Sequence, residues 1–309
     1  MRPSFQPRLI NDPFSDPGLF VPFLFDKRAL MFDIGDLQNL KPKDLLKLTH
    51  IFVTHAHMDH FIGFDSILRV LLGREKEIHL FGPSSFFHNV EGKLSGYTWN
   101  LVDEYPNDFR IKVTEVHESR MVTKTYHCRK GFLADEAKET EFSRILFQEP
   151  SFSVEAVLLD HKITCLGFSL IESFYINIIK ECLKELGLEV GPWVNRFKAS
   201  LYRKQSPDSI FTVTWRKDGK IIKEKKFLLG ELSEKIARIS PGQKIAYISD
   251  VAGSPENRKK IVELSEEADH LFIEAAFLHR DWGTAQKKYH LTAREAGEIA
   301  REAKVKQFS

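Results

Sequence analysis

The sequence predicts a layered α/β fold, because short apolar runs typical of strands are mixed with segments whose apolar residues recur at helical spacing. The clearest pair is a five-residue apolar run at 50–54 followed by helical spacing at 59–73. The chain has 309 residues, 42% hydrophobic and 28% charged, which is the composition of a globular protein. This composition excludes a disordered, collagen-like or coiled-coil chain, and we expect a single domain over 1–309.

The other elements follow in chain order. A polar turn joins the apolar runs at 19–25 and 29–35, which predicts a hairpin. Pro83 suits the first turn of a helix. A change of composition over about 174–240, beginning with an amphipathic helix at 174–186, predicts an inserted, projecting arm. Further strands are expected at 77–82, 111–117, 152–161, 163–172, 243–250 and 266–274, and a helix at 291–303.

Charge and cysteine content narrow the classes of function. Lys and Arg (45) nearly balance Asp and Glu (43), so RNA binding would need a local basic patch. Three widely spaced cysteines form neither a disulfide framework nor a CxxC metal pair, which indicates a reducing compartment. No apolar run approaches the ~20 residues of a membrane span, and the N-terminus lacks the apolar core of a signal peptide. We therefore expect a soluble, cytoplasmic protein with no membrane contact.

The most informative segment is Thr54–His60, which reads THAHMDH and follows the predicted strand directly. Three imidazoles and one carboxylate within six residues are the donors that Zn²⁺ or a similar divalent ion prefers. A lone histidine is usually a surface residue, but this set at a strand end predicts a metal site. Its candidate ligands are His55, His57, Asp59 and His60.

The HxHxDH cluster resembles the signature of the metallo-β-lactamase fold superfamily, and the longer pattern resembles the ribonuclease Z family of tRNA 3′-processing endonucleases. The matching segments are FDIGD (32–36), IFVTHAHMDHFIGFDSIL (51–68) and FGP (81–83). The resemblance implies a four-layer αββα sandwich with a two-metal site at one edge of the sheets and a projecting arm insertion.

The same resemblance assigns the remaining site residues. LLDHKITCLGF (158–168) selects His161 as a ligand, and YISDVAG (247–253) selects Asp250 as the bridge between two metals. IEAAF (273–277) and HLTAREAGEIA (290–300) select Glu274 and His290 as residues near the scissile phosphate. The implied roles are His55, His57 and His161 on the first metal, Asp59 and His60 on the second, Asp59 also as proton acceptor, and His290 as stabiliser or proton donor at the leaving group.

The sequence departs from the family pattern at three places. Met58 stands where a small residue is usual, which we expect to alter packing only. Ile273 and Ala276 replace a His and a Thr that flank the glutamate, which weakens the case for a relay through Glu274. The family's last metal ligand follows the helix that ends near residue 303, whereas this chain ends at 309. We expect a trimmed C-terminus, because 305–308 begins a strand; otherwise the second metal site is incomplete.

The implied activity is removal of the 3′ trailer from precursor tRNA. Two metal ions ~3.5–4 Å apart can hold a hydroxide and polarise a phosphoryl oxygen. The resemblance implies two Zn²⁺ per subunit in a homodimer, and Mn²⁺ or Fe²⁺ would suit the same ligands.

The predicted arm carries the local basic patch. Between Val194 and Phe227 ten Lys or Arg residues face three acids, a net charge of +7 against +2 for the whole chain. Interleaved aromatic residues and this charge are typical of a surface that follows a phosphate backbone. The alternative is a solvated helix and hairpin whose charges only aid solubility. The predicted nucleic-acid contacts are Arg196, Lys198, Arg203, Lys204, Lys223, Lys225 and Lys226.

Two other functions remain open. A hydrolase of the same fold could act on a small phosphodiester, ester or lactone, but it would not need the basic arm. A catalytically degenerate relative could bind RNA or protein without cutting it, which the altered 273–277 segment favours and the intact HxHxDH cluster opposes.

Overall fold

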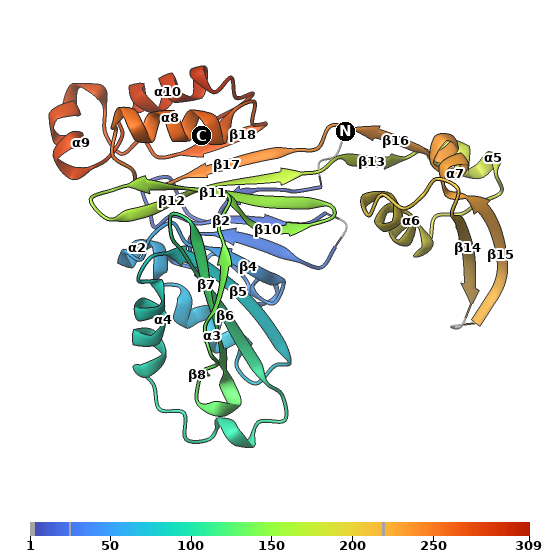
Figure 1. The fold of residues 1–309 in the computed structure, drawn as a ribbon, viewed down its shortest axis with the longest axis horizontal. Coiled ribbons are helices and arrows are strands. Elements are labelled where there is room, and N and C mark those ends of the chain that lie inside the picture. The colour runs from blue at the N-terminus through green and yellow to red at the C-terminus, as the bar shows by residue number, and fades with distance from the viewer. Residues whose placement is uncertain (1–3, 25, 218–219) are drawn as a thin grey trace. The chain divides into compact units, whose positions relative to one another are not determined.

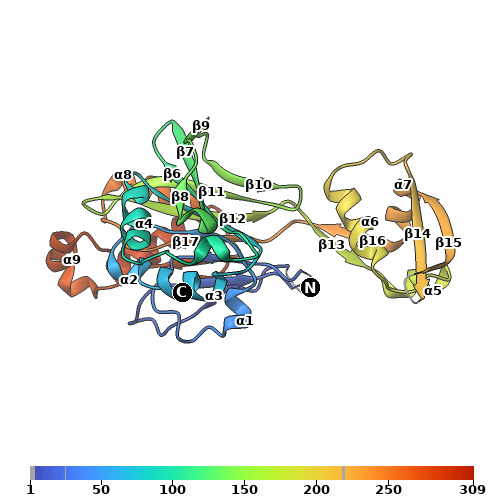
Figure 2. The same ribbon diagram turned by 90° about the horizontal axis from the view of Figure 1, so that it is seen from below.

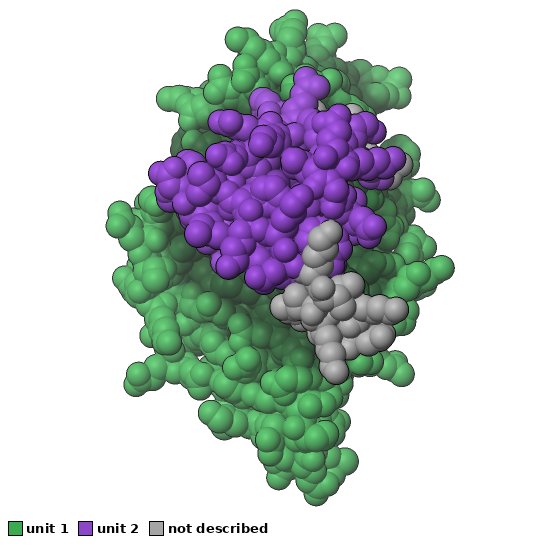
Figure 3. Space-filling model, turned by 90° about the vertical axis from the view of Figure 1, so that its right-hand side faces the viewer, with its two compact units in different colours: residues 1–146, 154–170, 244–309 green, residues 147–153, 171–243 purple. Residues whose placement is uncertain are grey.

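The structure is a computed structural model that describes residues 4–24, 26–217 and 220–309; the side chains of 216–223 lie outside this description. The chain forms two compact units, coloured separately in Figure 3. Unit 1 comprises 1–146, 154–170 and 244–309, and unit 2 comprises 147–153 and 171–243. The arm predicted at about 174–240 falls within unit 2, and the single-domain interpretation stays a prediction.

The larger sheet has nine strands in the described residues (Figure 1). Strands β1 to β8 lie side by side in chain order, and β9 pairs with β7. β3, β4, β5 and β6 are parallel neighbours, while β1, β2, β7, β8 and β9 add antiparallel pairs. The strands are β1 (Arg8–Leu9), β2 (Leu19–Pro22), β3 (Ala29–Phe32), β4 (Leu48–Phe52), β5 (Lys76–Pro83), β6 (Phe109–Val116), β7 (Arg120–His127), β8 (Leu133–Ala134) and β9 (Lys138–Glu141).

The second sheet has the order β10-β11-β12-β17-β18, and its last two strands are parallel. These strands are β10 (Ile145–Glu149), β11 (Phe152–Asp160), β12 (Thr164–Glu172), β17 (Lys244–Ile248) and β18 (His270–Ile273). The helices of unit 1 are α1 (Pro42–Leu45), α2 (Met58–Phe61), α3 (Phe64–Leu71), α4 (Phe86–Ser95), α8 (Pro255–Ser265), α9 (Trp282–Lys288) and α10 (Ala293–Glu302).

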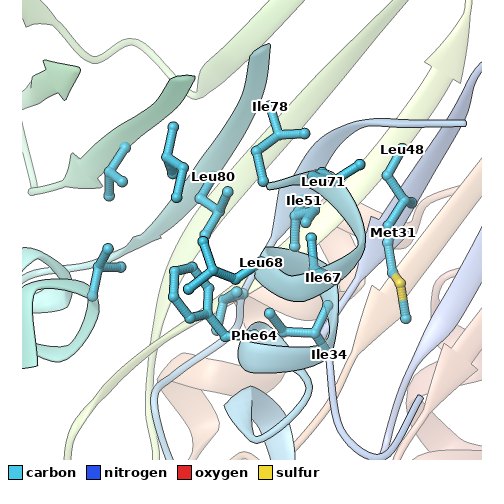
Figure 4. Close-up of a cluster of buried hydrophobic side chains, with 14 of the residues drawn as sticks. Met31, Ile34, Leu48, Ile51, Phe64, Ile67, Leu68, Leu71, Ile78 and Leu80 are labelled. Carbon is cyan, nitrogen blue, oxygen red and sulfur yellow. The ribbon is translucent and has the colours of Figure 1, made fainter. Parts of the chain in front are cut away.

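The strand sequences explain the layers, because alternate side chains point to opposite faces of a sheet. On β4 and β5, Ile51, Ile78 and Leu80 join the apolar cluster that α3 covers with Phe64 and Leu68 (Figure 4). The other face of this sheet meets the second sheet. The contact is aromatic and involves Phe32 and Phe52 from the first sheet and Phe168 and Tyr247 from the second, with ring centroids 5.6 to 5.7 Å apart.

Helices α8 and α10 cover the outer face of the second sheet. Ile261 of α8 and Ile299 of α10 share an apolar cluster with Ala246 and Leu271 of β17 and β18. Unit 1 is therefore a sandwich of helices, sheet, sheet and helices, as the sequence predicts.

Several predicted elements are confirmed and others are wrong. The hairpin is confirmed, since β2 pairs with β3 in antiparallel register. The single helix predicted at 59–73 is wrong: it divides into α2 and α3 at Ile62 and Gly63. Pro83 ends β5 rather than starting a helix, and α4 begins at Phe86.

Unit 2 has an apolar core of its own. Its elements are β13 (Tyr175–Ile178), α5 (Lys180–Glu185), α6 (Trp193–Tyr202), β14 (Ile210–Lys217), β15 (Lys220–Leu228), α7 (Leu229–Ile236) and β16 (Ala237–Ser240). Trp193 and Phe197 of α6 pack with Val213 of β14 and Leu232 of α7 in this core. The helix predicted at 174–186 is wrong in its first half, which forms β13. The predicted hairpin is present as the antiparallel pair β14 and β15, and its turn residues 218–219 lie outside the described residues.

One glycine allows the segment after β3 to lie against α2. A Cβ built on Gly35 would lie 2.5 Å from the Asp59 carbonyl oxygen and 2.5 Å from the Asp16 Cβ. Only a residue without a side chain fits so close an approach.

We predict that Gly35→Ala lowers the free energy of unfolding by about 2 kcal/mol, because the added methyl group overpacks this contact. Urea denaturation followed by circular dichroism measures the change. The matched control is Gly92→Ala within α4, where an added Cβ meets no atom within 4 Å. This control should raise stability by about 0.5–1 kcal/mol, and an equal loss in both variants would contradict the prediction.

Candidate metal centre

The candidate site forms where several strands end together. Parallel pairing of Phe32 with Phe52 brings the residues after β3 and β4 to one edge of the first sheet. Parallel pairing of Ile248 with Ile273 does the same in the second sheet, where Asp250 and Glu274 follow the strands. His161 lies in the tight turn between β11 and β12. Its backbone N–H donates to the Ile163 carbonyl at 2.9 Å.

Eight sequence-predicted residues meet at this edge in three overlapping groups. Within each group the potential ligand atoms all lie within 4.8 Å of one another, and Asp250 belongs to every group. The groups are His55, His57, His161 and Asp250; Asp59, His60 and Asp250; and Asp250, Glu274 and His290.

The Asp250 carboxylate is central to the cluster. Its Oδ2 lies 3.4 Å from Nε2 of His60, 3.6 Å from Nε2 of His161 and 4.0 Å from Nε2 of His55. Two ligands of a tetrahedral metal with bonds of 2.0–2.1 Å lie about 3.3 Å apart. The observed separations are therefore close to those of ligands that share an ion.

Outer hydrogen bonds orient two of these imidazoles toward the centre. His161 Nδ1 donates to the Tyr289 carbonyl at 2.7 Å, and His60 Nδ1 donates to Asp33 Oδ2 at 2.9 Å. Since each Nδ1–H is engaged, each Nε2 is left as the metal-binding atom. Such outer partners fix the tautomer and the ring orientation of histidine ligands.

Asp33 is a site residue that sequence reasoning missed. Its carboxylate is completely buried and accepts from the Thr54 backbone N–H at 2.7 Å, the Thr54 hydroxyl, His60 and the Tyr247 hydroxyl at 3.1 Å. Its φ of 53° lies in the left-handed region, which Asp tolerates better than most residues. The available signal is the FDIGD segment at 32–36, which matches the family pattern but is given no role in the predicted site.

Burial and charge shift the pKa values at the centre in opposite directions. Burial, together with the neighbouring His60, lowers the pKa of His55 to about 2, so His55 is neutral. Burial also acts to lower the pKa of His60, but the carboxylates of Asp33 and Asp250 outweigh it and raise this pKa to about 12. The pKa of Asp250 is lowered, because contact with His60 outweighs the opposite effect of burial.

Glu274 and His290 form a pair beside the Asp250 carboxylate. Both oxygens of Glu274 lie 3.1 Å from Nδ1 of His290, and the Val251 N–H donates to Glu274 at 2.8 Å. The hydrogen bond to Glu274 raises the pKa of His290, and burial raises the pKa of Glu274. Ile273 and Ala276 therefore do not prevent a direct contact between Glu274 and His290.

The residues present fit a divalent metal. Within the described chain, Nε2 of His55 and Nε2 of His60 are buried without a hydrogen-bond partner. An orphaned buried nitrogen is costly unless something binds it. Metal binding requires a neutral imidazole. A metal cation bound at Nε2 of His60 would therefore replace the proton there and supply the positive charge beside the carboxylates of Asp33 and Asp250.

Comparisons with known proteins agree with this geometry. No protein-family model matches the chain. Over 301 residues the chain is 26% identical to a protein named ribonuclease Z from Deinococcus radiodurans, and the match covers 96% of this chain and 86% of that protein. The structure of human tRNase Z, short form, matches with a TM-score of 0.50 at 18% identity and covers 99% of this chain and 89% of that one.

A metallo-β-lactamase fold protein from Bacillus subtilis, YhfI, matches with the same TM-score of 0.50 at 13% identity, covering 95% of this chain and 79% of that one. The chain has the metallo-β-lactamase fold. The predicted four-layer αββα sandwich is confirmed, and the clusters of His and Asp are consistent with a metal site of this fold. The identity of the metal and the number of ions remain predictions, as do the homodimer and the cytoplasmic location. None of the helices in the described ranges has the length and apolar character to span a bilayer.

Unit 2 carries the predicted nucleic-acid contacts. The side chains of three of them, Arg196, Lys198 and Lys225, contact other groups of unit 2. Arg196 donates to the Thr214 hydroxyl at 2.9 Å, and Lys225 donates to the Leu186 carbonyl at 2.9 Å. The Lys198 ammonium lies 5.7 Å from the Tyr175 ring, and burial lowers its pKa. Arg203, Lys204 and Lys226 are exposed, whereas the side chain of Lys223 lies outside the described residues.

We predict that Asp33→Asn weakens metal binding at the Asp59, His60 and Asp250 group by about 10–100-fold, because His60 loses the partner that fixes its orientation. Chelator competition on the purified protein measures this affinity. Asp36→Asn is the matched control, since the Asp36 carboxylate accepts the Gln38 N–H instead. Equal affinity of the Asp33 variant and the unmodified protein would contradict the prediction.

Proposed function

We propose that the protein is a metal-dependent phosphodiesterase of the ribonuclease Z type that removes the 3′ trailer from precursor tRNA. The observation that carries the proposal is the convergence of four imidazoles and two carboxylates, with two buried Nε2 atoms that lack a hydrogen-bond partner, at one sheet edge. The relatives named ribonuclease Z, matched over 90% or more of this chain, support the choice of substrate.

In this proposal the chain holds two ions, either Zn²⁺ or the similar Mn²⁺ or Fe²⁺. His55, His57 and His161 hold one ion, Asp59 and His60 hold the other, and Asp250 contacts both. When bound, the ions supply a nucleophile at neutral pH and neutralise charge on the phosphoryl oxygens.

In this proposal Asp59 accepts a proton from water and His290 donates a proton to the leaving group. Asp59 is half exposed and its Oδ2 lies 3.4 Å from Nε2 of His60, so it can accept a proton from water at the mouth of the site. His290 presents Nδ1 to Glu274, which leaves Nε2 free to protonate the departing ribose oxygen. The raised pKa of His290 favours the protonated form that such a donor requires.

The exposed cations of unit 2 supply the RNA-binding surface in this proposal. Arg203 and Lys204 end α6, and Lys226 lies on β15. Contacts of this kind bind phosphates regardless of sequence. A hydrolase of the same fold for a small phosphodiester, ester or lactone is the second candidate, and the cleavage tests below separate the two.

We predict that Asp59→Ala reduces cleavage of a 3′-extended precursor tRNA by at least about 10³-fold, because a metal ligand and a proton acceptor are lost together. Binding of the precursor, measured by filter retention, should change less than about twofold, because the phosphate contacts lie elsewhere. Metal chelation should abolish cleavage by the unmodified protein, and readdition of Zn²⁺ should restore it. Comparable cleavage by the variant would refute the proposed site.

Replacing Arg203, Lys204 and Lys226 together with Ala should weaken precursor binding and reduce the slope of log affinity against log salt by about 2, since each lost phosphate contact contributes about 0.7–0.9. The control removes the same charge from unit 1 through Lys41, Lys43 and Lys259, which are exposed. An unchanged slope in the first variant would show that these cations of unit 2 do not contact RNA and only aid solubility.

A further inference from the structure

Four large apolar side chains on the segments that carry the candidate ligands remain open to solvent. They are Met58, Ile163, Leu278 and Trp282, and we call them the apolar rim. Their exposed fractions are 76%, 43%, 54% and 49%. The exposure of Met58 shows that it does not alter the packing of the core, contrary to the sequence-based expectation. Exposed apolar side chains grouped in this way are typical of an interaction surface.

The rim residues come from separate parts of the chain that lie together in space. Met58 begins α2, Ile163 lies in the turn between β11 and β12, and Trp282 begins α9. These elements lie at the same end of unit 1 in Figure 1 and, from below, in Figure 2. This is also the end at which the candidate ligands meet, since His161 lies in the same turn as Ile163.

Trp282 is the rim residue whose side chain forms a hydrogen bond in the described structure. Its indole N–H donates to Glu295 Oε1 at 3.2 Å. The other oxygen of Glu295 accepts from the backbone N–H and the hydroxyl of Thr292, at 2.8 and 2.7 Å, in the capping box that starts α10. The polar atom of the indole is therefore satisfied and its orientation fixed, while about half of the side chain remains exposed.

Trp282 is connected through Glu295 to the loop that follows Asp250. A Cβ built on Gly253 would lie 2.9 Å from Glu295 Oε1 and 2.9 Å from Gln286 Nε2, so the loop after Asp250 packs against both the partner of Trp282 and α9. Gly253 is three residues from Asp250, and three residues span at most about 10 Å. The carboxylate that holds the indole thus packs on the loop that carries Asp250, which places the indole on the side of the ligand cluster that this loop forms.

We propose that Trp282 stacks on an unpaired nucleobase of the RNA beside the scissile phosphate, and that Met58 contacts the adjoining nucleotide. This inference rests on the proposed function and adds a residue that selects single-stranded RNA. An aromatic side chain with one open face is the usual platform for a base and accepts any base. An acyl chain, by contrast, needs an enclosed apolar pocket, which four exposed side chains from separate segments do not provide. Lys162, exposed beside Ile163, supplies a cation for the neighbouring phosphate.

The first test is steady-state cleavage of a 3′-extended precursor tRNA by the metal-loaded full chain. Trp282→Ala should raise KM about tenfold with kcat within about twofold, because base stacking contributes to binding. Trp282→Phe should stay within about threefold of the unmodified KM, and Met58→Ala should raise KM about threefold. Tyr97→Ala is the matched control, because Tyr97 is 48% exposed and follows the end of α4 that points away from the ligand cluster.

The second test removes the base instead of the side chain. Precursors with one abasic nucleotide on either side of the cleavage position are compared in a double-mutant cycle with Trp282→Ala. At the position that stacks, the tenfold effect of the substitution should fall below about twofold. An unchanged KM for Trp282→Ala, or an equal effect with every abasic substrate, overturns the proposal.

A binding measurement keeps this inference separate from the proposed function. A single-stranded RNA oligonucleotide should quench the tryptophan fluorescence of the unmodified protein, and Trp282→Phe should lose that quenching. If precursor tRNA is not cleaved but quenching depends on Trp282, the proposed function fails and the stacking surface stands. If quenching is absent or is the same in Trp282→Phe, the stacking surface fails whatever the cleavage result.

Discussion

The Asp33 carboxylate joins the two sheets at the edge where the candidate ligands meet. It accepts hydrogen bonds from Thr54 at the end of β4, from His60 on α2 and from Tyr247 on β17 of the opposite sheet. A buried carboxylate with several donors is stable only while all of them remain in place. The spacing of the sheets and the orientation of an imidazole at the centre are therefore set by one group, so the fold and the site depend on each other.

Much of this arrangement can be predicted from the sequence, because the relevant signals are local. His55, His57 and His60 lie within six residues, and the apolar run before them ends where a buried strand should end. His161 and Asp250 are the last residues of predicted strands, and their selection as ligands depends on the family resemblance. The structure brings these residues together with Asp59, Glu274 and His290.

Features that depend on contacts between distant residues could not be predicted in this way. The Tyr289 carbonyl that orients His161 belongs to a backbone in the left-handed conformation, with φ of 62°, which no property of a tyrosine side chain predicts. β8 is only two residues long and β9 is charged, and both are exposed throughout, so they lack the apolar alternation by which strands are recognised. The break between α2 and α3 arises because Gly63 lies against the backbone of residues 34 and 35, a contact 28 residues away in sequence.

Unit 2 begins and ends at neighbouring points, because Tyr175 of β13 pairs with Ser240 of β16. A segment whose two ends are adjacent can lengthen, shorten or be exchanged without pulling apart the strands that bear it, since closing such a loop adds little entropy cost. It also has its own apolar core, so changes within it need not be compensated in the sandwich. The candidate metal centre and the basic surface are thus free to evolve at different rates, and descendants of this chain could change the surface of unit 2 while keeping the candidate ligands constant.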